Sequence, residues 1–264
     1  MILERFEMIF DTHAHYDDEA FDEDRESIIE SLKGEGIVNV VNVGANIASS
    51  KRSIALSDKY DFFYAAVGVH PDDANEVTEE GIKILKDLAA NEKVKAIGEI
   101  GLDYYWNKDN KEIQKEAFIK QIELAKEVNL PILIHSREAA LDTMDILKET
   151  NAGKTVGGVV HCFSYSPEIA KEAIDLGFYI GIGGVLTFKN AKKLKETVEV
   201  IPLEKIVLET DCPYLAPDPF RGKRNYSAYL QYVVKAIAEL KNTDIATVED
   251  ITHKNALDMY RLTK

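Results

Sequence analysis

Residues 94–135 read VKAIGEIGLDYYWNKDNKEIQKEAFIKQIELAKEVNLPILIH and contain a strand, a helix and a second strand. The run Val94–Ile100 is short and mainly apolar, which is typical of a buried strand. In Lys111–Val128, Lys and Glu are interleaved with apolar residues at helical spacing, and Pro131–Ile134 is apolar again. Two buried strands separated by a helix predict a parallel pair joined by a helical crossover.

The same pattern returns along the whole chain. The other apolar runs are Phe6–Phe10, Ile37–Val43, Phe62–Val69, Gly158–Val160, Phe178–Ile182 and Ile206–Leu208. The other segments with a helical pattern are Glu23–Lys33, Ala48–Lys59, Thr78–Asn91, Glu138–Glu149, Pro167–Leu176, Ala191–Val200, Ala228–Leu240 and Ile245–Leu262. Eight such strands predict an α/β fold, a closed (β/α)8 TIM barrel, as a single domain over residues 1–264. An open, doubly wound sheet is the alternative, because strands are hard to count from one sequence.

Composition limits the class of protein. The chain has 264 residues, of which 45% are hydrophobic, and a formal net charge of −14. This apolar content supports a folded core and excludes an intrinsically disordered chain. No apolar run approaches the roughly 20 residues that cross a bilayer, so we expect no membrane partner. The acidic excess argues against a broad basic face that wraps nucleic acid, so any phosphate must be bound locally.

The N-terminus and the cysteines bear on the compartment. Met1–Glu7 contains an early acidic residue and no basic segment ahead of a long apolar run, so it does not predict a secretory signal. Cys162 and Cys212 are too few for a disulfide framework. We therefore expect a cytoplasmic protein.

Histidines are concentrated where the expected strands end. Five of the six histidines lie there, close to Glu99 and Asp211 at two further strand ends; the five are His13, His15, His70, His135 and His161. A single histidine at such a position usually bonds only a neighbouring backbone group, but chance rarely gathers five of them. In TIM barrels the chemistry sits at this end of the strands. Because His13 and His15 are two residues apart on a strand, both side chains point to one face and can bind one ion.

Imidazoles mixed with carboxylates are typical of a metal site. This donor set suits Zn, Mn, Fe or Ni, and the carboxylates also admit Mg. The residues offer more ligands than one ion with open positions requires, so we expect two divalent metal ions about 3.5 to 4 Å apart. Glu99 is the candidate bridge between them, because it ends a strand on the far side of the barrel mouth from His13 and His15.

Six motifs, in order, resemble the signatures of the TatD-type metal-dependent deoxyribonucleases of the amidohydrolase superfamily. They are FDTHAH (10–15), VGVHP (67–71), IGEIGLDY (97–104), PILIHSR (131–137), HCFS (161–164) and LETDCPYL (208–215). The tail RGKRN (221–225) fits the same resemblance.

The resemblance implies a TIM-barrel hydrolase with a defined set of metal ligands. The ligands implied are His13, His15, Glu99, His135, His161 and Asp211. It also implies cleavage of DNA phosphodiester bonds, with single strands or 3′ ends as substrate and Zn, Mg or Mn as the metal. We expect Glu99 and Asp211 to be catalytic, with Asp211 accepting the proton of the attacking water and a 5′-phosphate left on each released nucleotide.

Other residues are candidates for substrate contacts. Arg221–Arg224 is a basic cluster beyond the last strand, where barrels often bind phosphate, so we expect Arg221 and Arg224 to bind it; a solvated turn is the alternative. His70 precedes a proline and is expected to contact substrate or to orient a ligand. The segment Asp103–Trp106 predicts either a platform for an unpaired base or a cap on the barrel rim. Within it, we expect Tyr104 to contact the substrate.

Two neighbours of the ligands have expected supporting roles. Glu209 lies two residues before Asp211 and is expected as a buried partner of a ligand. Cys162 is expected to pack as a small apolar side chain.

Two other functions compete with the nuclease. One is a hydrolase of a C–N or C–O bond in a small molecule, since a fold does not fix its substrate. The other is a non-catalytic metal-binding protein. The basic cluster favours a phosphate substrate, because a neutral amide gives no reason for it.

Overall fold

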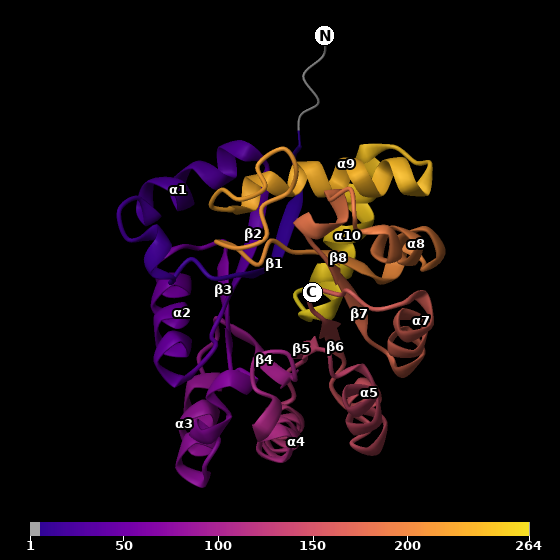
Figure 1. Ribbon diagram of the computed structural model, residues 1–264. Helices are drawn as coiled ribbons and strands as arrows, with labels where there is room; N and C mark the ends of the chain where they lie inside the picture. The colour runs from indigo at the N-terminus through magenta and orange to yellow at the C-terminus, as the bar shows by residue number, and fades with distance from the viewer. Residues whose placement is uncertain (1–5, 264) are drawn as a thin grey trace.

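The barrel expected from the sequence is present in the computed structural model, which describes residues 6–263. Eight parallel strands pair in the order of the chain and form a nearly closed barrel (Figure 1). The strands are β1 (Ile9–Ala14), β2 (Ile37–Val43), β3 (Phe63–Val67), β4 (Val94–Asp103), β5 (Ile132–Arg137), β6 (Gly158–Val160), β7 (Tyr179–Ile182) and β8 (Ile206–Leu208). Residues 1–5, which carry most of the segment relevant to a secretory signal, lie outside the described range.

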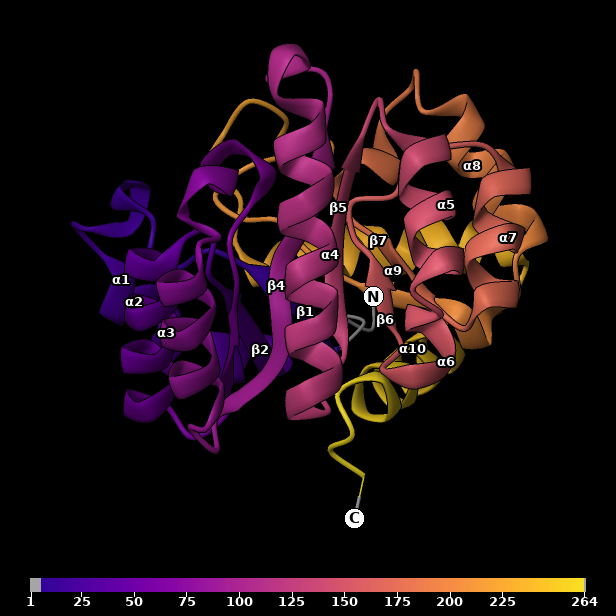
Figure 2. The same ribbon diagram turned by 90° about the horizontal axis from the view of Figure 1, so that it is seen from below.

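Helices form the outer layer of the barrel. They are α1 (Arg25–Ser31), α2 (Ile47–Lys59), α3 (Glu79–Ala89), α4 (Lys111–Val128), α5 (Ala140–Glu149), α6 (Ala152–Thr155), α7 (Pro167–Leu176), α8 (Lys192–Val200), α9 (Leu230–Lys241) and α10 (Ile245–Met259). In Figure 2, α3 and α4 stand side by side outside the strands. Local signals set several starts: the Asn46 side chain caps α2, and the Thr78 hydroxyl accepts the Gly81 N–H at the start of α3. Within residues 6–263, no helix combines the length and the apolar character needed to span a bilayer.

The interior of the barrel is apolar at one end. Its buried residues include Phe10, Val41, Leu133 and Val207 from the strands. Tyr260, directly after α10, adds its ring, which stacks on Phe10 at a centroid distance of 5.8 Å. The Tyr260 hydroxyl donates to the backbone oxygen of Thr12. The C-terminal segment therefore covers the apolar end of the barrel, and polar side chains gather at the opposite end.

Two strands extend further into polar sequence than expected. The apolar run Phe6–Phe10 predicts the first strand too early, since β1 runs on through Asp11, Thr12 and His13, all fully buried. Likewise β4 continues to Asp103. An apolar run ends at the first charged residue, whereas a barrel strand carries buried polar residues at its carboxyl end. The seam between β1 and β8 closes there, with the Asp211 N–H donating to the His13 oxygen at 2.9 Å.

Candidate metal centre

The end of β1 and the residue that follows it place two imidazoles, those of His13 and His15, side by side. The Nε2 atoms of His13 and His15 lie 3.1 Å apart, and the Nδ1 of His15 donates to the backbone oxygen of Val43 at 2.9 Å. That bond fixes the tautomer and leaves Nε2 free for a cation. Asp211 follows β8, and its Oδ1 lies 3.4 Å from His15 Nε2. The Oε2 of Glu99 lies 3.5 Å from His13 Nε2.

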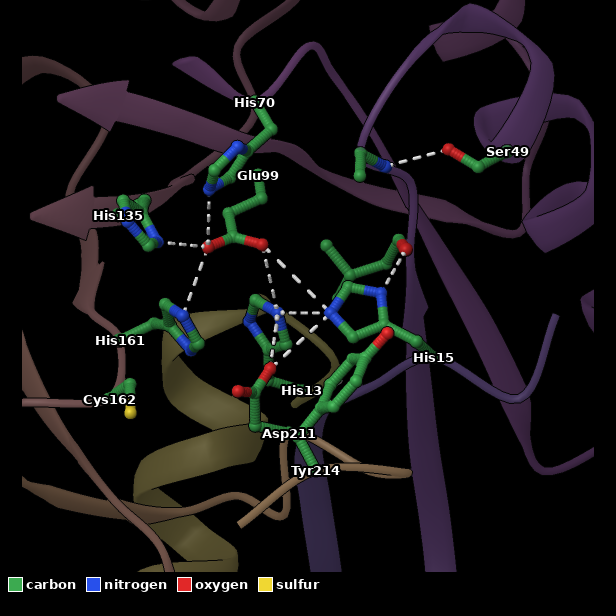
Figure 3. Close-up of polar contacts among 12 residues, drawn as sticks. His13, His15, Ser49, His70, Glu99, His135, His161, Cys162, Asp211 and Tyr214 are labelled. Atoms are coloured by element: carbon green, nitrogen blue, oxygen red, sulfur yellow. Dashed lines mark hydrogen bonds and ion pairs between the residues drawn. The ribbon is translucent and has the colours of Figure 1, made fainter. Parts of the chain in front are cut away.

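The other oxygen of Glu99 faces a separate set of imidazoles. Oε1 lies 2.7 Å from His135 Nδ1, 3.0 Å from His161 Nε2 and 3.9 Å from His70 Nε2 (Figure 3). These histidines come from β5 and from the segments that follow β6 and β3. The two oxygens of one carboxylate therefore serve two different groups of nitrogen donors.

The spacing of the donor atoms fits a divalent metal. Zinc ligands lie about 2.0 to 2.2 Å from the ion, so two ligands of one ion lie about 3 to 3.5 Å apart. Several donor pairs fall in this range, and three overlapping sets have all their donor atoms within 4.8 Å of one another. The sets are His13, Glu99 and His161; His13, His15 and Asp211; and His70, Glu99 and His135. Imidazole and carboxylate donors without a thiolate suit Zn, Mn or Fe.

Two carboxylates stand behind the ligands. The Oδ2 of Asp103 lies 3.1 Å from His135 Nε2, so His135 is held between two acids. The Oε1 of Glu209 lies 3.5 Å from His161 Nδ1 and also accepts the N–H of Cys162. Glu209 is 1% exposed, which agrees with the expected buried partner. Carboxylates in this position orient metal-binding imidazoles and increase their basicity.

Burial lowers the pKa of His13 and of His70, but at His15, His135 and Asp103 the charged form is favoured in spite of burial. Burial favours the neutral imidazole of His15, but the Asp211 carboxylate outweighs it and raises the pKa of His15 to about 9. Burial likewise opposes protonation of His135, but Asp103 and Glu99 raise its pKa to about 9. For Asp103, burial is outweighed by the bond to His135, and its pKa falls to about 2. Protons on the imidazoles thus balance the carboxylates, and a divalent cation can replace those protons.

A cavity of about 330 Å³ opens above the cluster. Arg52 from α2 and Tyr214 from the segment after β8 line it, beside the metal-ligand candidates. Tyr214 is 54% exposed and its hydroxyl donates to Asp18. The sequence reasoning missed both as lining residues. Tyr214 lies inside the LETDCPYL motif, which is a usable signal, whereas Arg52 is one surface cation among many.

The expected substrate contacts differ in where they lie. His70 lines the cavity, but its Nε2 is near enough to Glu99 to make it a candidate ligand as well. Tyr104 is only 6% exposed and donates its hydroxyl to Asp142, so it does not line the cavity.

The basic cluster after β8 also differs from the expectation. Arg224 forms a two-pronged ion pair with Asp24, at 2.8 and 2.6 Å, and a third bond to the Ala20 oxygen. Its guanidinium thus joins two loops, and Arg224 is not among the residues that line the cavity above the cluster. The Arg221 guanidinium lies over the Phe188 ring at 4.3 Å, outside the cavity lining.

Comparison with known proteins identifies the family of the chain. A family model described as TatD related DNase matches residues 10–261. The chain is 51% identical over 255 residues to a Bacillus subtilis protein named uncharacterized metal-dependent hydrolase YabD, spanning 97% of this chain and 100% of that protein. It is 33% identical over 258 residues to the 3′-5′ ssDNA/RNA exonuclease TatD of Cronobacter sakazakii, spanning 96% of this chain and 97% of that one.

Solved structures agree with this relationship. YJJV, a TatD homologue from Escherichia coli, superposes with a TM-score of 0.91 at 29% identity, over 97% of this chain and 98% of that one. An organophosphorus hydrolase from Deinococcus radiodurans, at 12% identity and a TM-score of 0.64, covering 96% of this chain and 92% of that one, shares the fold alone. The chain therefore belongs to the TatD-related DNase family and is a metal-dependent hydrolase of that family.

Proposed function

We propose that this protein is a two-metal nuclease that removes nucleotides from the 3′ end of single-stranded DNA. The observation that carries the proposal is the division of Glu99, whose two oxygens face different sets of histidines. One carboxylate shared between two ions is typical of binuclear hydrolases. The DNase description of the family and the exonuclease name of the Cronobacter relative support nucleic acid as the substrate.

The two sides of Glu99 give two ligand sets. Those on the Oε2 side are His13, His15 and Asp211; those on the Oε1 side are His135 and His161, with His70 close by. Zn, Mg and Mn are the candidate metals. When bound, such ions polarise a phosphoryl oxygen and lower the pKa of nearby water.

The residues of this chain have separate tasks in the proposed reaction. Asp211 is the more accessible carboxylate, with 20% of its side chain exposed against 6% for Glu99, and it accepts the proton of the attacking water. The water oxygen bonds to phosphorus, and the bond between phosphorus and the 3′ oxygen of the remaining strand breaks. That oxygen takes up a proton and becomes the new 3′ hydroxyl, while the released nucleotide keeps a 5′-phosphate. Asp103 and Glu209 keep His135 and His161 oriented during this step.

One assay tests the proposal. Metal-depleted protein is refilled separately with Mg, Mn or Zn and given end-labelled single-stranded DNA, double-stranded DNA and RNA. We expect stepwise shortening from the 3′ end of single-stranded DNA, release of nucleoside 5′-phosphates, and no cleavage without metal. If no metal supports cleavage of any nucleic acid, while a small amide or ester is hydrolysed, the small-molecule hydrolase replaces the nuclease.

A further inference from the structure

Two large aromatic side chains are exposed on the loop between β4 and α4. Tyr105 is 43% exposed and Trp106 is 66% exposed, whereas Tyr104 beside them is 6% exposed. A segment that only capped the barrel rim would bury its rings, as Tyr104 does. Leaving two adjacent rings in water is unfavourable unless something covers them, so exposed aromatic patches often mark binding sites.

The loop is fixed to the metal-ligand candidates by one carboxylate. The Oδ1 of Asp103 accepts the N–H groups of Tyr105 and Trp106 at 2.8 and 2.9 Å, and its Oδ2 lies 3.1 Å from His135 Nε2. His135 in turn contacts Glu99 at 2.7 Å. One carboxylate and one imidazole therefore link the backbone of the two exposed residues to the centre of the cluster.

Other contacts hold the loop in place. Gln114 from α4 donates to the backbone oxygens of Asp103 and Asn107, and the Asn107 amide donates to Asp72 at 2.6 Å. The exposed rings thus belong to a loop tied at several points, which is what a preformed binding surface needs.

A cation completes the surface. The Arg137 guanidinium, at the end of β5, lies 4.2 Å from the centre of the Tyr105 ring and 5.5 Å from that of Trp106. Arg137 is exposed and forms no ion pair with any residue in the range 6–263. Tyr105 and Trp106 meet edge to face at 89°, with ring centroids 4.7 Å apart, so the edge of one ring adjoins the face of the other. Because the guanidinium lies over the Tyr105 ring, the 66% exposed Trp106 ring is the surface left for stacking, and the charge remains free for an anion beside it.

We propose that Tyr105, Trp106 and Arg137 form a platform that binds an unpaired nucleobase beside the scissile phosphate. The proposal rests on the proposed function and adds a reason for single-strand preference. A base inside a duplex has both faces covered by its neighbours, whereas an unpaired base can stack on an aromatic ring, largely independently of sequence. The guanidinium suits the flanking phosphate or the π-face of the base.

Trp106 is the only tryptophan in the chain, so its fluorescence reports on the platform directly. Metal-loaded protein is titrated with a hydrolysis-resistant phosphorothioate single strand and with a strand of the same length that lacks bases. We expect quenching by the first strand and little by the second, which binds about tenfold more weakly because each stacked base contributes to affinity. Equal quenching and equal affinity for both strands would overturn the platform.

Variants supply an independent check. In Trp106→Ala, we expect KM for single-stranded DNA to rise about tenfold. The preference for base-bearing over abasic strands should fall by the same factor. The matched control is Leu141→Ala, an exposed apolar residue at 74% in the first turn of α5, whose KM should match that of the unmodified protein. DNA cleavage by Trp106→Ala with an unchanged KM would refute the platform and leave the nuclease intact. If no DNA is cleaved by the unmodified protein, the nuclease fails, while quenching still tests the platform.

Discussion

The two sides of Glu99 are built in different ways. On the Oε2 side, His13 lies on β1 and His15 directly follows this strand, two residues further along, and the Asp211 N–H donates to the backbone oxygen of His13. On the Oε1 side, the ligand candidates come from three separate parts of the barrel and need buried acids behind them. The end of β1 supplies both imidazoles of the first side, whereas those of the second side come from three other parts of the barrel, with Asp103 and Glu209 behind them.

Glu99 belongs to both sides, so its loss should have the largest effect. In Glu99→Gln, the amide retains the shape but loses the charge shared between the two sides. We expect turnover on single-stranded DNA to fall by about 1,000-fold, the upper end for one electrostatic group. Metal content per chain, measured on the same sample, should fall as well. Full metal content with near-normal turnover would show that Glu99 is no bridge.

Asp211 tests the Oε2 side for catalysis rather than binding. Asp211→Asn removes the base while nearly preserving shape, so we expect a turnover loss of at least about 100-fold. Much of the metal should remain, because His13, His15 and Glu99 are intact. Single-turnover cleavage and metal content are measured on the same sample. Normal cleavage at full metal occupancy would show that Asp211 is not the base.

Asp103 tests whether the Oε1 side needs its supporting acids. In Asp103→Asn, His135 loses a charged partner, and metal affinity on this side should fall about 10- to 100-fold while the other side is unaffected. Competition with a chelator measures both affinities. Asp61→Asn, which alters an exposed ion pair with Lys33, is the control. Equal weakening on both sides would contradict the division at Glu99.

Protonation gives the most gradual effect, because it changes continuously with pH. Without metal, His15 on one side and His135 on the other have pKa values of about 9, so both carry a proton at pH 7. Metal must displace these protons, so affinity should increase with pH up to about pH 9, by about tenfold per pH unit for each proton released. Calorimetry in two buffers of different ionisation enthalpy counts the protons. Identical heats in both buffers would mean that none is released.

The same contrast explains what sequence alone could predict. His13 and His15 are recognisable because their spacing places them on one face of a strand. The eight-stranded barrel follows from repeated apolar runs, although buried polar residues such as Asp11 hid where β1 ends. Glu99 is expected from the sequence as a bridge, but which histidines face each of its oxygens is not visible there, since that depends on how distant strands meet.

Long-range contacts account for the remaining differences. Arg224 looked available for phosphate because its partner, Asp24, lies 200 residues away in the chain. Tyr104 and Trp106 belong to the same segment, Asp103–Trp106, and only packing buries one ring and exposes the other. Spacing and composition carry no information about such contacts.

Diffraction from crystals loaded with Mn²⁺, collected to locate the anomalous scattering of manganese, tests the two-sided centre most directly. We predict two peaks about 3.5 to 4 Å apart, with one oxygen of Glu99 toward each. One peak should lie beside His13, His15 and Asp211, and the other beside His135 and His161. A single peak at full loading, or two peaks that do not share Glu99, would contradict the account.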